Sequence, residues 1–116
     1  MPEPKPTISY EDFVKLDLRI ARIVEVSDHP NADKLLCVKI DLGDEQRQII
    51  AGLKGFYEAE SLVGKQVLVV TNLEPRKMRG LESSGMLLAA VVDDEEMRKV
   101  VVLCPEKDVP PGTAVS

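Results

Sequence analysis

The sequence has few of the side chains that most catalytic and metal sites need. It contains one histidine, two cysteines, four aromatic residues and no tryptophan among 116 residues. The single histidine, His29, excludes a histidine-based metal cluster and leaves one candidate base for a nucleophile–histidine pair. The scarcity of aromatic residues argues against a platform on which single-stranded bases stack one after another. We therefore expect no catalytic residue, no metal ligand and no cofactor.

The sequence also lacks long apolar runs and a secretory leader. No run approaches the length of a membrane span, and the N-terminal residues MPEPKPTIS have no apolar stretch behind a basic start. Their three prolines predict a flexible or extended lead-in over residues 1–9. Cys37 and Cys104 each lie in an apolar stretch, which favours small buried side chains, with a disulfide between them as the alternative. These features indicate a cytoplasmic protein without a membrane partner.

The chain is acidic overall, with a net charge of −5, but its charges are segregated. Residues 72–79 hold three cations and one carboxylate, whereas residues 93–99 hold four carboxylates and two cations. Because salt screens charges over about 8 Å, a ligand responds to a local basic patch whatever the net charge. We interpret the acidic run at 93–96 as a solvated turn, since nothing in the sequence equips it for acid–base chemistry.

Alternation of apolar and polar residues predicts an all-β protein with a short helix. One face of the first strand is expected to carry Leu16, Leu18, Ile20, Val24 and Val26, interrupted by Arg22. One face of the second strand is expected to carry Leu36, Val38, Ile40 and Leu42. The expected elements are a helical turn at 10–15, strands at 16–26, 34–42, 47–53, 65–73 and 85–92, a helix at 53–63 ending at Gly64, and a further strand at 100–103.

This order of elements is typical of the OB-fold, a five-stranded Greek-key barrel, here with a C-terminal extension. Ligands of such barrels meet one face and the loops that join strands one to two and four to five. In this chain those loops are SDHPNADK, residues 27–34, and EPRKMRGLESS, residues 74–84. The periodicity assigns neither loop to the core, so both are candidate binding segments.

The second loop has the chemistry of a surface for a nucleic-acid backbone. Cationic side chains donate charge-assisted hydrogen bonds to phosphate oxygens, hydroxyls contact phosphate or ribose, and a methionine offers an adaptable apolar surface. The residues that supply these groups are Arg76, Lys77, Arg79, Ser83, Ser84 and Met86. The alternative is a charged loop that is merely solvated. Without an aromatic platform, a folded RNA recognised by its shape and backbone fits this set best.

The first loop carries a weaker signal. Lys34 is positioned for a phosphate and Asn31 for a sugar or a base edge, while Lys54 flanks the same surface. The alternatives are a well-made turn with no chemistry for the loop and a solvated lysine at position 54.

Three blocks of the sequence resemble a known family. They are FVKLDLRIARIVEVSDHPNADKL, IIAGL and NLEPRKMRGLESSGMLLAA, of which the last is the most specific. They are similar to the tRNA-binding domain found at the C-terminus of many methionyl-tRNA synthetases, in the human aminoacyl-tRNA synthetase complex and as small free-standing dimers. The resemblance implies an OB-fold that binds tRNA by structure rather than by sequence. It places the matching site residues at Asn31, Lys34, Arg76, Lys77, Arg79, Ser83, Ser84 and Met86.

The resemblance also implies partners and a division of the chain. Residues 1–9 form the lead-in, residues 10–95 the OB-fold tRNA-binding domain, and residues 96–116 a strand and tail that mediate a homodimer. For the strand at 100–103 the alternative is a sixth strand within the same subunit. A methionyl-tRNA synthetase catalytic chain is the second expected partner.

Two further functions compete with non-catalytic tRNA binding in support of methionyl-tRNA synthetase. The first is a dimeric peptide-binding or chaperone-like OB-fold protein that holds an extended segment by strand addition. The second is an enzyme, whose only candidate residues would be His29 and the carboxylates of residues 93–96.

Overall fold

The computed structural model describes residues 2–116. Two short helices are present, α1 (Tyr10–Phe13) and α2 (Ala59–Leu62). The strands are β1 (Leu18–Asp28), β2 (Leu36–Asp41), β3 (Gln46–Ala51), β4 (Gln66–Val70), β5 (Arg76–Met78), β6 (Leu81–Ser83), β7 (Met86–Leu87), β8 (Ala89–Asp93), β9 (Arg98–Val102) and β10 (Ala114–Val115). The regular secondary structure is therefore mostly β with two short helices, as predicted.

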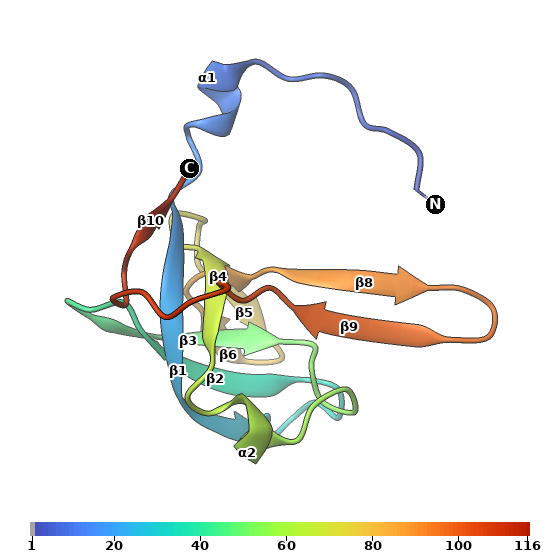
Figure 1. The fold of residues 1–116 in the computed structure, drawn as a ribbon. Coiled ribbons are helices and arrows are strands. Elements are labelled where there is room, and N and C mark those ends of the chain that lie inside the picture. Colours follow the sequence, from blue (N-terminus) through green and yellow to red (C-terminus); the bar gives the residue numbers. More distant parts are fainter. Residues whose placement is uncertain (1) are drawn as a thin grey trace.

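The main sheet curves into a nearly closed barrel. Its strands pair in the order β3-β2-β1-β4-β7, and all of these neighbours are antiparallel. The N–H of Ser84 donates to the carbonyl of Gln48 at 2.9 Å, which brings the chain just before β7 back to β3. This closure is the Greek-key order of an OB-fold, so the predicted fold class is confirmed. Figure 1 shows the barrel with α2 beneath it and α1 above it.

Strand β1 presents only part of the predicted face to the core. Ile20 is buried and Val26 packs against the core, as predicted, but Ala21 and Ile23 are buried as well, whereas Val24 is exposed. The pairing with β2 shifts register between Ile23 and Glu25, and this bulge moves the following side chains to the other face of the sheet. The prediction that Leu16 and Val24 face the core is therefore wrong, since both are exposed.

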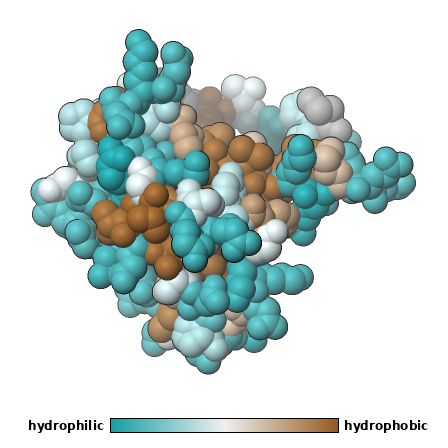
Figure 2. Space-filling model, turned by 60° about the horizontal axis from the view of Figure 1, so that its bottom comes forward, coloured by the Kyte–Doolittle hydropathy of each residue, from teal (hydrophilic) through white to brown (hydrophobic). Residues whose placement is uncertain are grey.

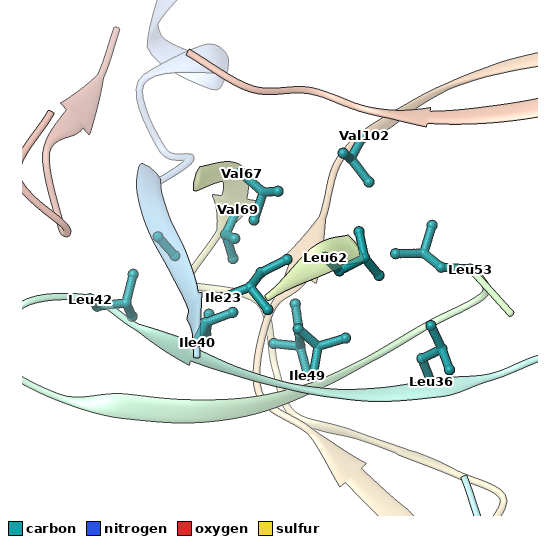
Figure 3. Packing of buried hydrophobic residues seen from close by; sticks show 12 residues of the cluster. Ile23, Leu36, Ile40, Leu42, Ile49, Leu53, Leu62, Val67, Val69 and Val102 are labelled. Atoms are coloured by element: carbon teal, nitrogen blue, oxygen red, sulfur yellow. The ribbon is translucent and has the colours of Figure 1, made fainter. Parts of the chain in front are cut away.

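The core fills the inside of the barrel (Figure 3). Strand β2 confirms its predicted alternation. Leu36, Val38, Ile40 and Leu42 are all buried. Leu62 of α2 packs among them, and burial of each such side chain contributes about 1.5–3 kcal/mol.

The predicted helix at 53–63 is mostly wrong. Only Ala59–Leu62 is helical, because the N–H groups of Phe56 and Tyr57 both donate to the carbonyl of Leu53 and form a tight turn first. Gly64 has a φ of 92°, which confirms the predicted left-handed residue after the helix.

The predicted fifth strand at 85–92 is divided into β7 and β8 at Leu88. Residues 100–102 of the segment at 100–103 lie in β9, which pairs with β8 of the same chain from Ala89 opposite Val102 to Asp93 opposite Arg98. The β8–β9 hairpin extends away from the barrel (Figure 1). The boundary expected between residues 95 and 96 falls in the turn of this hairpin.

Both cysteines are free thiols. Cys37 is half-buried, and burial raises the pKa of its thiol. Cys104 is exposed, so the prediction of a buried side chain is wrong for this residue. Within residues 2–116, no helix has both the length and the apolar character needed to span a membrane.

Candidate nucleic-acid interface

The segment expected to be a loop between strands four and five is a β-hairpin. Strands β5 and β6 pair antiparallel, with Lys77 opposite Glu82 and Met78 opposite Leu81. The two residues between them, Arg79 and Gly80, have φ values of 54° and 91°. Positive φ at both central residues defines a type I′ turn, which matches the twist of paired strands. The turn therefore places the Arg79 side chain at the tip of a regular hairpin.

The first loop is hydrogen-bonded to this hairpin through His29. The imidazole is buried, its Nδ1 accepts the N–H of Asn31 at 3.0 Å, and its Nε2 lies 2.8 Å from the carbonyl oxygen of Met78. Because Nδ1 accepts, the proton belongs on Nε2, which donates to that carbonyl. The Asn31 amide adds a longer contact of 3.5 Å to the carbonyl of Arg79. The two predicted segments, far apart in sequence, therefore lie side by side.

Ser83 fastens the other end of the hairpin to the barrel. Its buried Oγ accepts the N–H of Ile50 at 2.9 Å and donates to the carbonyl of Gly85 at 3.1 Å. The backbone of Ser84 is tied to β3 by its bond to Gln48, and its side chain is half-buried. In this arrangement the Ser83 hydroxyl positions the hairpin rather than facing solvent.

The cations of the two segments are exposed and free of carboxylate partners. Within residues 2–116, no carboxylate oxygen lies within 4.0 Å of the side-chain nitrogens of Lys34, Arg76, Lys77 or Arg79. Lys54 differs, because its Nζ lies 3.1 Å from Asp28 Oδ2. We call the four free cations, together with Asn31, the basic rim. Their uncompensated charge is available to an anionic ligand.

A hollow of about 240 Å³ lies beside the hairpin. It is lined by the end of β3, by the segment before β5, and by residues of β5, β7 and the β8–β9 hairpin. Among the predicted binding residues it includes Arg76, Ser83 and Met86, and Met86 is 44% exposed. The remaining predicted cations lie outside its lining.

Comparison with known proteins identifies the family. A family profile described as "Putative tRNA binding domain" matches residues 18–114. The chain belongs to this family. The matched region of this tRNA-binding domain contains both loops and every predicted binding residue, and it leaves out the lead-in and α1.

The relatives of this tRNA-binding domain include methionine–tRNA ligases of archaea. The chain is 55% identical to the ligase of Thermococcus kodakarensis and 57% identical to that of Pyrococcus furiosus, each over 108 residues. Each match covers 93% of this chain and 14% of the ligase. The chain therefore spans about one seventh of the length of these curated relatives.

Two solved structures share the whole fold. One is a MetRS-related protein from Pyrococcus horikoshii, with a TM-score of 0.86 and 29% identity, covering 97% of this chain and 100% of that one. The other is the chaperone CsaA from Bacillus anthracis, with a TM-score of 0.85 and 30% identity, covering 96% of this chain and 100% of that one.

Sequence reasoning missed the part that His29 plays in this tRNA-binding domain. It assigned His29 to a turn, and the Asn31 N–H bond within that turn agrees with the assignment. The bond to Met78 could not be predicted, because its acceptor is a backbone carbonyl that any residue supplies. The only available signal was a lone histidine two residues before an asparagine in a predicted binding loop.

Proposed function

We propose that this chain is a non-catalytic module that binds tRNA by its structure and supports methionyl-tRNA synthetase. The observation that carries the proposal is the basic rim, in which free cations from two distant segments are held together through His29. Guanidinium and ammonium groups held at fixed spacing suit the phosphates of a folded RNA. The archaeal methionine–tRNA ligases that the chain resembles support the link to methionyl-tRNA synthetase.

The proposal assigns each predicted residue a role. Arg76, Lys77, Arg79 and Lys34 contact phosphates, and Asn31 contacts a ribose or base edge. Ser83 and Ser84 hold the hairpin on β3, and Ser84 has the more accessible side chain. Met86 supplies apolar surface, while Lys54 contributes only weakly because Asp28 neutralises it. The module has no catalytic site of its own and acts in the cytoplasm, where it raises the local concentration of tRNA for the synthetase.

We further propose that the chain forms a homodimer through residues 96–116 together with β8. Support comes from apolar side chains on one face of the β8–β9 hairpin, since Val92 is 42% exposed and Val101 is 46% exposed. Figure 2 shows that apolar residues gather in patches on one face of the molecule instead of being scattered singly. Exposed apolar strands of this kind are natural elements for association between chains.

Filter binding tests the proposed function. The purified chain is titrated against total tRNA and against random single-stranded RNA of the same length, each across a series of salt concentrations. We expect tighter binding to tRNA, and log affinity should fall with log salt by about 0.9 or less for each neutralised phosphate. Equal affinity for the two RNAs would contradict structure-specific binding.

Peptide binding is the second candidate function. Its support is the fold and 30% identity shared with the chaperone CsaA, together with the apolar lining of the hollow. A peptide binder has no need of four free cations beside that hollow, which is why we rank it second. A competition experiment tests whether the two ligands use one surface, because tRNA should displace a bound peptide only if they share it.

A further inference from the structure

The hollow beside the β5–β6 hairpin combines apolar walls with two opposite charges. Its apolar lining includes Leu73, Met78 and Met86, and Leu73 and Met86 are 41% and 44% exposed. Glu74 and Arg76 are the two charged residues of the lining. They are two positions apart, on either side of Pro75, so the charges stand together at one hollow.

Neither charge is compensated by the protein. Glu74 and Arg76 are exposed, and neither takes part in an ion pair or a side-chain hydrogen bond among residues 2–116. Arg76 fits the anionic backbone that the basic rim is proposed to bind. Glu74 does not, because a carboxylate repels phosphates and weakens binding unless it accepts a hydrogen bond from the ligand.

We propose that this hollow receives one unpaired nucleobase of the bound RNA, and that Glu74 selects a base with amino donors. This proposal rests on the proposed tRNA-binding function. The base ring lies against the methionine and leucine side chains, its Watson–Crick edge donates to Glu74, and Arg76 contacts a neighbouring phosphate. Carboxylates accept from base amino groups, and unpaired bases of folded RNA expose that edge. Guanine, with two adjacent donors, fits best, and uracil, whose one donor lies between two carbonyls, fits worst.

The pair of charges favours a nucleotide over an apolar peptide side chain. A side chain in the hollow would use the methionines but would leave both Glu74 and Arg76 without a partner. A nucleotide satisfies both charges, since it carries donors on its base and a negative charge on its phosphate.

Nuclear magnetic resonance with mononucleotides tests the proposal. The chain, labelled on its methionine methyl groups and backbone amides, is titrated with guanosine 5′-monophosphate and with uridine 5′-monophosphate. The same titrations are made on Glu74→Gln and on Glu82→Gln. Glu82 is a matched control, because it lies on the same hairpin opposite Lys77 but does not line the hollow.

We expect the guanosine nucleotide to shift the methyl resonances of Met78 and Met86 and to bind about fivefold or more tightly than the uridine nucleotide. Glu74→Gln should remove this preference, and Glu82→Gln should keep it. Equal binding of the two nucleotides, or shifts confined to other residues, would overturn the proposal. So would methyl shifts produced only by an alternating Leu-Lys peptide, which would assign the hollow to peptides.

A parallel tRNA titration separates this inference from the proposed function. If tRNA binds with its steep salt dependence while the mononucleotides show no base preference, only the base pocket is wrong. If the unaltered chain binds no tRNA, the proposed function fails and the base pocket fails with it.

Discussion

Two hairpins leave the same barrel and differ in net charge, in the exposure of apolar side chains and in how they are attached to the barrel. The β5–β6 hairpin carries free cations and is fastened to the barrel by His29 and Ser83. The β8–β9 hairpin extends outward, exposes valines, and ends in an acidic turn in which Asp94 Oδ1 accepts the N–H groups of Glu96 and Met97. A fixed cationic hairpin suits a polyanion, and an apolar hairpin with an acidic tip suits a protein surface and repels RNA.

The barrel between the hairpins gives the reference for this comparison. The cations within β1, β2 and β3 are matched with carboxylates, as in the pairs Arg19 with Asp17 at 2.9 Å and Lys39 with Glu25 at 3.4 Å. Exposed pairs of this kind contribute between about 0 and 1 kcal/mol to stability. The cations of these strands are therefore engaged with the protein itself, whereas those of the basic rim are free for a ligand.

Removal of the hairpin charges should have the largest effect. The triple variant Arg76→Ala, Lys77→Ala, Arg79→Ala is expected to weaken tRNA binding about 100-fold and to reduce the salt slope by about 2 to 3, because three phosphate contacts are lost. Filter binding across a salt series measures both quantities. The control is Lys15→Ala with Lys39→Ala, which removes paired cations. Equal losses for each charge removed in the triple variant and in the control would mean that only net charge matters.

Loss of the hydrogen bond that joins the two segments of the basic rim should have the next largest effect. His29→Asn keeps a side-chain acceptor for the Asn31 N–H but is too short to reach the Met78 carbonyl. We expect tRNA affinity to fall about tenfold while the melting temperature falls by only a few degrees, since one hydrogen bond contributes about 0.5–1.5 kcal/mol. Wild-type affinity in this variant would show that the bond to Met78 does not organise the site.

The face of the β8–β9 hairpin that points away from the hollow should affect assembly and not RNA contact. Val92 and Val101 project from the face opposite to the one that buries Val102, since cross-strand partners share a face. Val92→Asp with Val101→Asp should convert a dimer into a monomer in sedimentation velocity without unfolding it. A chain that stays dimeric would exclude this hairpin as the dimer contact.

The smallest effect is expected at the paired cations of the barrel. The hydrogen bond from Arg19 holds the pKa of Asp17 below its ordinary value. The stabilisation that this hydrogen bond contributes is therefore present at pH values above the ordinary pKa of Asp17. It is lost as the pH falls through the lowered pKa. The stability difference between wild type and Asp17→Asn, measured by urea unfolding, should stay below about 1 kcal/mol at pH 7 and shrink towards pH 2. A stability difference that grows as the pH falls would contradict the predicted direction of the pH dependence.

Sequence reasoning succeeded where apolar and polar residues alternated without interruption through a whole strand. Strand β2 alternates without interruption, so all its buried residues were predicted. Strand β1 failed because a bulge after Ile23 leaves no mark in composition. The β5–β6 hairpin was missed because its turn is Arg79-Gly80 rather than the Asn-Gly that signals such turns. The candidate cations could be selected from residue types, whereas the fastening of their segments through backbone carbonyls could not.

Hydrogen–deuterium exchange with and without tRNA measures the convergence of the two segments most directly. If residues 29–34 and 76–84 form one surface, tRNA should slow exchange in both ranges together and leave residues 92–98, which do not line the hollow, unchanged. Slower exchange in residues 92–98 with no change at the basic rim would contradict the proposed site.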